Sequence, residues 1–148
     1  MTNNLTGRYL DFEISVRPRF SEIDAMGIMW HGSYVKILEN VREDFGAAHS
    51  MGYMDVYRNG FMTPVVHMTI DYKLPIRYEE DIQIKARYLE CKAAKIVFEY
   101  IMIKPDGRVC ATAESVQVFI DLDGELQLAY PDFHLNWAAA LPWKSDDK

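Results

Sequence analysis

The segment from Ser21 to Ser33, SEIDAMGIMWHGS, holds the residues best suited to chemistry. It places Asp24 seven residues before His31, and a stretch with helical periodicity follows. Surface loops are usually polar, whereas this one is largely apolar and carries isolated ionisable groups. An apolar loop of this kind is typical of a lined pocket, so we expect a binding or catalytic site here.

The start of the following helix adds to the chemistry that this loop could perform. Unpaired backbone N–H groups and the positive end of the helix dipole could hold a carbonyl oxygen as it becomes an oxyanion. Asp24 could act as base toward water or attack the carbonyl itself. Gly27 and Gly32 would let a substrate approach the backbone closely. By spacing alone, an Asp before a glycine is more often an Asx turn, and a lone His more often a local hydrogen-bonding group.

Hydrophobic periodicity predicts the elements that position this loop. Residues 11–20 alternate between apolar and polar and predict a strand, in which Pro18 marks an edge or a bulge. Tyr34 to Ala48 carries an apolar stripe at helical spacing, with Ser33 as the expected N-cap. Residues 1–10 are polar and predict no regular structure.

The rest of the chain predicts mostly strands. The expected elements are a short helix at 51–61, strands at 64–74, 81–90, 95–104 and 108–121, turns at 106–107 and 123–124, and a helix at 131–137. This order indicates a single α+β domain over residues 1–148, with a core over about 11–130 and a long helix packed on an antiparallel sheet.

Composition limits the classes of function. With 148 residues, a net charge of −6 and a pI near 5.2, the chain lacks the basic balance of a general nucleic-acid binder. Cys91 and Cys110 have no metal-ligand spacing, so we expect free thiols, no metal and a cytoplasmic protein. No apolar run approaches the roughly 20 residues that a membrane helix needs, and the first ten residues have no secretory pattern.

Three segments together resemble the 4-hydroxybenzoyl-CoA thioesterase-like hotdog family. The most specific is EIDAMGIMWHGSY at residues 22–34, followed by Leu38-Glu39 and Arg42. The segments IDYKLPIRYEED at 70–81 and 108–121 are similar to two of the family's strands. The resemblance covers about residues 12 to 123.

This resemblance implies an acyl-CoA thioesterase with the hotdog fold, in which a curved antiparallel sheet wraps one long helix. Asp24 would be nucleophile or general base, and the backbone N–H of His31 would polarise the carbonyl. Met29, Trp30 and Tyr34 would line the acyl side. Two subunits would join edge to edge as a homodimer, and dimers as a homotetramer, with active sites at the interface. Coenzyme A would enter only as part of the substrate, with no other cofactor.

Two positions depart from the family's pattern. Ile76 replaces the usual alanine after the proline, and Met26 stands where a small residue or proline is common. Both substitutions could reshape the acyl pocket, so the acyl group is left open.

Other residues compete for the same roles. Glu22, Glu39 and Glu43 are alternative acids, although Glu39 is expected to pair with Arg42 one turn later. For the phosphates of coenzyme A we expect Arg77, Lys92 and Lys95, which could equally be solvated surface charges. His49, His67 and His134 are expected to be structural.

Two further functions stay open at this point. One is a thioesterase acting on acyl carrier protein, and the other is an acyl-CoA-binding hotdog dimer without catalysis. Dehydratases share the fold but typically pair a catalytic His with Asp or Glu.

Overall fold

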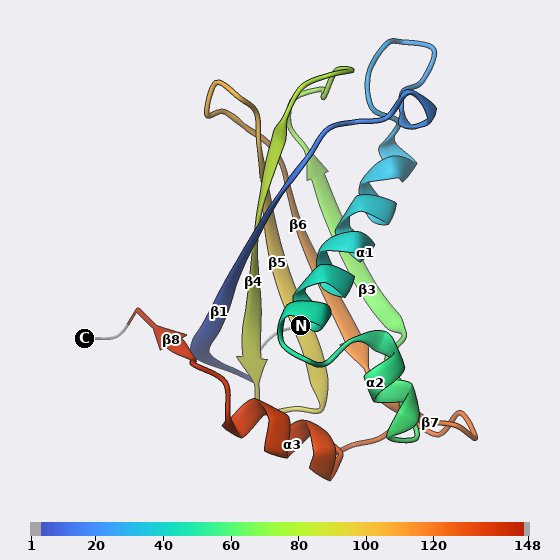
Figure 1. Cartoon of the computed structure of the whole chain (residues 1–148), viewed down its shortest axis with the longest axis vertical. Helices are drawn as coiled ribbons and strands as arrows, with labels where there is room; N and C mark the ends of the chain where they lie inside the picture. The colour runs from blue at the N-terminus through green and yellow to red at the C-terminus, as the bar shows by residue number, and fades with distance from the viewer. Residues whose placement is uncertain (1–3, 147–148) are drawn as a thin grey trace.

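A long helix, α1 (His31–Ala48), lies across one face of a twisted antiparallel sheet in this computed structural model, which describes residues 4–146 (Figure 1). Within these residues six strands form the sheet in the order β3-β6-β5-β4-β1-β8. They are β1 (Leu5–Val16), β3 (Val65–Tyr72), β4 (Ile82–Cys91), β5 (Lys95–Ile103), β6 (Val109–Val118) and β8 (Lys144–Ser145). Short strands β2 (Phe61–Met62) and β7 (Ile120–Asp121) pair separately, and helices α2 (Tyr53–Arg58) and α3 (Asp132–Ala139) complete the predicted α+β architecture.

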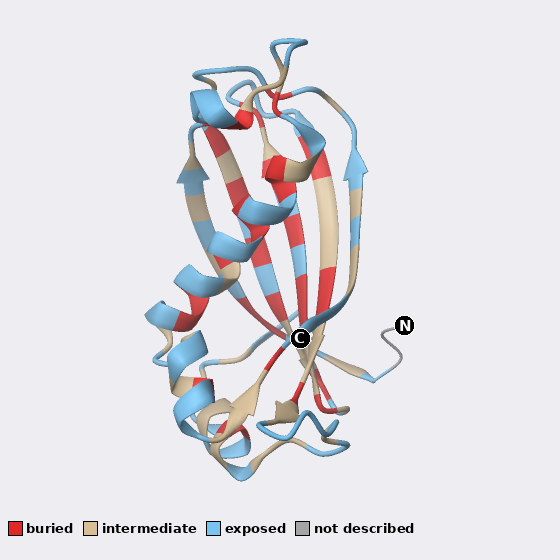
Figure 2. Ribbon diagram, turned by 90° about the vertical axis from the view of Figure 1, so that its right-hand side faces the viewer, coloured by how far each residue is buried: buried red, intermediate tan, exposed pale blue. Residues whose placement is uncertain are grey.

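The apolar stripe of α1 forms the core with the inner face of the sheet. Tyr34, Ile37, Leu38, Val41 and Phe45 are all buried against it. The sheet contributes alternate residues of each strand, which produces the striped burial along the strands in Figure 2. Burying a large apolar side chain contributes roughly 1.5–3 kcal/mol, so this stripe fixes the orientation of α1.

The N-terminal strand begins earlier than its alternation indicates. The sequence predicts no regular structure before residue 11, but β1 starts at Leu5 and ends at Val16, ahead of Pro18. Tyr9 and Leu10 are buried because β1 pairs with β4 over almost its whole length. The interpretation of residues 1–3 lies outside the described part of the chain.

The predicted long strand at 108–121 is divided. Its pairing in the six-stranded sheet ends at Val118, Phe119 is fully buried, and Ile120–Asp121 pair with β2 instead. The Asp106-Gly107 turn is present, with Gly107 at φ +89°, a conformation that favours glycine.

The expected pair between Glu39 and Arg42 is not formed among the described residues. Arg42 Nη1 instead donates to the hydroxyl of Tyr100 at 3.0 Å, and that hydroxyl also shares a 2.7 Å hydrogen bond with Ser115. Tyr100 is 1% exposed, and burial raises the pKa of its phenol. A buried phenol needs a hydrogen-bond partner, which accounts for the direction of the Arg42 side chain.

The C-terminal elements cover the end of the sheet opposite the start of α1 (Figure 1). Trp137 of α3 and Trp143 pack against the core, and the Tyr88 hydroxyl contacts His134 Nε2 at 3.2 Å. Over residues 4–146, no helix is long and apolar enough to span a bilayer, and no group of three or more His, Cys, Asp or Glu could hold a metal.

The burial of His134 predicts a pH-dependent stability. Burial lowers its pKa from 6.5 to about 4, while the neighbouring Tyr88 and Tyr130 phenols have raised pKa values and stay neutral. The unfolded chain therefore takes up this proton first, and stability falls as the pH decreases from about 6.5 toward 4. The contribution is on the order of 3 kcal/mol at most.

Urea unfolding at several pH values between 7.5 and 4 checks this expectation. His134→Phe should lose less stability on acidification than the wild type does. Protonation of the carboxylates lowers the stability of both proteins equally, so the difference between them reports on His134. Equal losses in the two proteins would exclude His134 as the source.

Candidate active site

A tight hairpin holds Asp24 at the N-terminal end of α1. The Asp24 N–H donates to Ile28 O at 2.9 Å, and the Gly27 N–H donates to Asp24 O at 3.0 Å. Gly27 has φ +77°, which a residue with a side chain rarely adopts. Asp24 Oδ1 accepts from the Met26 N–H at 2.8 Å, so the expected Asx turn is present. No hydrogen bond to the second carboxylate oxygen is formed from the described residues, and it is available to a ligand.

The buried carboxylate of Glu22 fixes this hairpin to the helix. Its Oε1 accepts from the Arg19 N–H at 2.7 Å, and its Oε2 lies 3.3 Å from Lys36 Nζ. The Glu22 carbonyl accepts from the Trp30 N–H at 2.8 Å and from Ser33 Oγ at 3.2 Å. With all these partners, Glu22 is a structural residue here.

The helix begins three residues earlier than predicted. Trp30 is the N-cap and His31 the first helical residue, so the expectation of Ser33 as N-cap is wrong. The Ser33 hydroxyl is occupied by the carbonyl of Glu22, a contact that fixes the loop and does not cap the helix.

The first turn of α1 leaves backbone donors unused. Within the described residues, the N–H groups of His31 and Gly32 have no acceptor, whereas that of Ser33 donates to Trp30 O at 2.9 Å. The His31 carbonyl accepts from the Tyr72 hydroxyl at 3.0 Å, which ties the helix tip to the end of β3. The His31 side chain is exposed. Two free donors at a helix N-terminus can bind a developing negative charge.

The indole of Trp30 covers the tip beside Gly32. A Cβ added to Gly32 would overlap the six-membered ring of this indole. The ring is half-exposed and also contacts His31, with ring centroids 5.1 Å apart. Gly32 therefore gives room to Trp30, whose indole fills the space that a side chain at this position would occupy.

Two other expected acyl-side residues lie in the core. Met29 and Tyr34 are each 3% exposed, and burial raises the pKa of Tyr34 to about 12. The Met29 N–H donates to the carbonyl of Ile76, a fully buried residue, at 2.7 Å. Of the two departures from the family pattern, Ile76 thus belongs to the core, while Met26 is exposed at the hairpin.

The three expected phosphate-binding residues divide between the two ends of the sheet. Arg77 forms a backbone bridge with Ile28 and so lies beside the Asp24 hairpin. No ion pair to its side chain is formed within residues 4–146. Lys92 and Lys95 lie at the β4–β5 hairpin, the opposite end of the same subunit (Figure 1).

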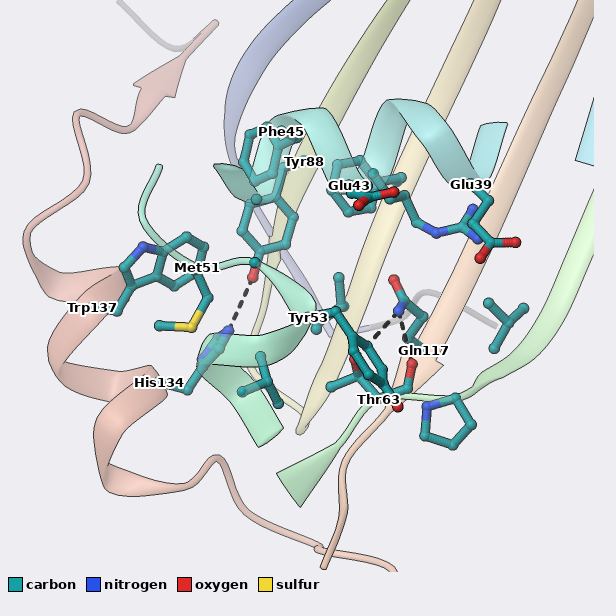
Figure 3. Close-up of a pocket in the computed structure, with 18 residues that line it drawn as sticks. Glu39, Glu43, Phe45, Met51, Tyr53, Thr63, Tyr88, Gln117, His134 and Trp137 are labelled. Carbon is teal, nitrogen blue, oxygen red and sulfur yellow. Dashed lines mark hydrogen bonds between the residues drawn. The ribbon is translucent and has the colours of Figure 1, made fainter. Parts of the chain in front are cut away.

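One cavity of the structure was not expected from the sequence. It has a volume of about 510 Å³ and lies beside the C-terminal half of α1 (Figure 3), and neither Asp24 nor His31 is among its lining residues. Glu39 and Glu43, two of the competing acids, line it. Its remaining walls come from α2, β3, β4, β5, β6 and α3 and from loop residues 51–52 and 63–64, whose association no local pattern indicates.

The comparisons with known proteins agree with this fold. The thioesterase-like superfamily matches residues 18–138. YneP of Bacillus subtilis (strain 168) is 27% identical over 129 residues, covering 84% of this chain and 94% of YneP. Acyl-CoA thioester hydrolase YbgC of Escherichia coli O157:H7 is 24% identical over 110 residues, which cover 74% of this chain and 82% of YbgC. DHNA-CoA thioesterase from Staphylococcus aureus superposes with a TM-score of 0.74 at 25% identity, and the match covers 88% of this chain and 89% of that protein. The predicted hotdog fold is confirmed.

The contact between Trp30 and Gly32 predicts a substitution effect that reverses sign. Gly32→Ala should destabilise the wild type, because the new methyl group displaces the indole. In a Trp30→Ala background the same change should stabilise by up to about 1 kcal/mol, since alanine favours helix over glycine. Urea unfolding of the four proteins measures both effects, and the same sign in both backgrounds would rule out the contact.

Proposed function

The chain belongs to the thioesterase-like superfamily, and we propose that it hydrolyses acyl-CoA thioesters to a free acid and coenzyme A. The observation that carries the proposal is the position of Asp24. Its hairpin returns the chain to the start of α1, where the His31 and Gly32 N–H groups have no acceptor within the described residues. The carboxylate on this hairpin and the two backbone donors at the helix tip are the groups that would flank a bound thioester carbonyl.

Two routes of thioester hydrolysis are open to this arrangement. In the first, Asp24 attacks the carbonyl carbon and expels the thiolate of coenzyme A, and water then hydrolyses the mixed anhydride. In the second, Asp24 removes a proton from water, which attacks the carbonyl, and the tetrahedral intermediate expels the thiolate. In both, the helix-tip donors would stabilise the negatively charged oxygen.

Arg77 is the residue best placed to meet the phosphates of coenzyme A in the same subunit. It adjoins the Asp24 hairpin through its bridge to Ile28 and is exposed. A free guanidinium can bind a phosphate through two parallel hydrogen bonds. The roles of Lys92 and Lys95 in phosphate binding remain predictions. Both lie at the other end of the sheet from Asp24, so they could meet the phosphates only from a second subunit.

The free edge of β3 supports the expected dimer. Among the described strands, β3 pairs only with β6, so its other edge has unpaired backbone groups. The edge exposes Val65, Val66 and Tyr72 and has no lysine or proline. The opposite edge of the sheet is partly covered by β8, and β1 carries several charged residues. Asp71 is the one acidic residue of this strand. A long exposed edge with so little charge can pair with another strand, and a second copy of β3 can pair with it antiparallel about a two-fold axis.

Asp24→Asn is the direct test of the catalytic acid. Asn keeps the Asx turn through its side-chain oxygen but removes the carboxylate, so we expect kcat for acyl-CoA hydrolysis to fall about 100-fold or more with an unchanged melting temperature. Asp44→Asn, at an exposed position of α1, is the matched control and should retain full activity.

The competing acids give the alternative outcome. If Glu39→Gln abolishes turnover while Asp24→Asn leaves it intact, the acid lies on the helix. Measuring the same acyl group on coenzyme A and on acyl carrier protein separates the two substrate classes.

The dimer has its own test at the middle of β3. Thr69→Glu should place two carboxylates close to each other across the two-fold axis and shift the protein toward monomer in sedimentation velocity. Ser15→Glu, on the exposed face of β1, should leave the association state unchanged. A wild-type chain that sediments as a monomer would contradict the proposed interface.

A further inference from the structure

The cavity beside α1 lies too far along the helix to serve the active site of its own subunit directly. Glu39, at its near end, is eight residues after His31, and Gly46 is at its far end. At 1.5 Å per residue, the cavity starts about 12 Å from the helix tip and extends to about 22 Å. Within one subunit, an acyl chain would have to cross the exposed flank of α1 before it entered.

Strand β3 connects this cavity to the helix tip of a second copy. Val65, at the start of β3, lines the cavity, while Tyr72, at its end, donates to the His31 carbonyl. In an antiparallel pair of β3 strands about a central two-fold axis, Val65 of one copy lies opposite Tyr72 of the other. Adjacent strands are about 4.8 Å apart, so the tip of one subunit would face the cavity of the other.

The lining of the cavity is graded from polar to apolar. Glu39 and Glu43 lie toward one side, and Gln117 is held by hydrogen bonding to Thr63 (Figure 3). The other side is formed by apolar and aromatic side chains: Phe45, Met51, Val56, Tyr88, Ile96, Phe98 and Trp137. An acyl group with its thioester at the polar side would place its alkyl end among the rings.

A single hydrogen-bonded pair closes the inner end. Tyr88 and His134 line this cavity and also a second one of about 340 Å³ on the far side of α3, and they contact each other at 3.2 Å. Both side chains are 3% exposed. Removal of the imidazole would join the two cavities.

Building on the proposed thioesterase function, we propose that this cavity is the chamber for the alkyl chain of a substrate cleaved by Asp24 of the other subunit. The Tyr88–His134 pair ends the chamber and sets the longest chain that fits. Each methylene that enters should raise kcat/KM by up to about fourfold until the chain meets this pair.

A panel of straight-chain acyl-CoAs from acetyl to palmitoyl tests the chamber. Ile96→Trp places a large ring in it and should lower kcat/KM for the preferred chain at least about tenfold, while acetyl-CoA hydrolysis stays within about twofold because the acetyl group does not reach the chamber. His134→Ala should move the preferred length to longer chains. If His134→Ala does not fold, by circular dichroism, the Ile96→Trp result decides alone.

Mixed dimers test whether the chamber acts across the interface. Subunits carrying Asp24→Asn and Ile96→Trp are co-expressed with different tags, and the mixed dimer is purified. If Asp24 and the chamber come from different subunits, one site stays intact, and the long-chain rate should be about half that of the wild type per dimer. If they come from the same subunit, both sites are damaged and the rate stays at the level of the parent variants.

The outcomes separate this inference from the proposed function. A wild type that hydrolyses no acyl-CoA refutes the thioesterase proposal itself. Hydrolysis in which Ile96→Trp reduces all chain lengths equally or none, or in which the mixed dimer is inactive, refutes the chamber in the other subunit and leaves the thioesterase proposal standing.

Discussion

The position of Asp24 depends on a buried carboxylate that takes no part in the proposed chemistry. Glu22 holds the entry to the loop through Arg19 and Lys36, while its own carbonyl holds Trp30 and Ser33 at the start of α1. A buried carboxylate needs such partners, because desolvation without them is costly. The same contacts that satisfy Glu22 therefore fix the distance between the loop and the helix tip.

The two ends of α1 differ in what they offer a ligand. The N-terminal end presents free backbone donors and a carboxylate but is not among the linings of the two described cavities. The C-terminal half borders the 510 Å³ cavity but has no such donors, because the last carbonyls of a helix are acceptors. A dimer about β3 would bring these complementary halves together, since an antiparallel pair reverses one subunit relative to the other.

The C-terminal segment has a larger part in this arrangement than its length indicates. Helix α3 contributes His134 to the lining of both cavities and Trp137 to that of the 510 Å³ cavity, and β8 covers part of the outer edge of β1. One edge of the sheet is thus covered by β8 or carries several charges, while the β3 edge has Asp71 as its one acidic residue and stays free within the described chain. This difference indicates where a second subunit can add its strand.

The sequence by itself determined the elements whose stability is local. The apolar stripe of α1, the alternation in β4 and β5 and the Asp106-Gly107 turn all depend on near neighbours, so periodicity and turn chemistry predicted them. Asp24 and the Gly27 turn were likewise visible as a short motif ahead of a helix.

Only the tertiary structure decided what depends on residues far apart in the chain. Residues 5–10 form a strand because β4 pairs with them. Arg42 bonds to Tyr100, 58 residues away, and not to its helical neighbour Glu39. Part of the cavity lining is the contact between Tyr88 and His134, which are 46 residues apart in the sequence. Such contacts follow from how the buried surfaces fit together, and no pattern of adjacent residues encodes that fit.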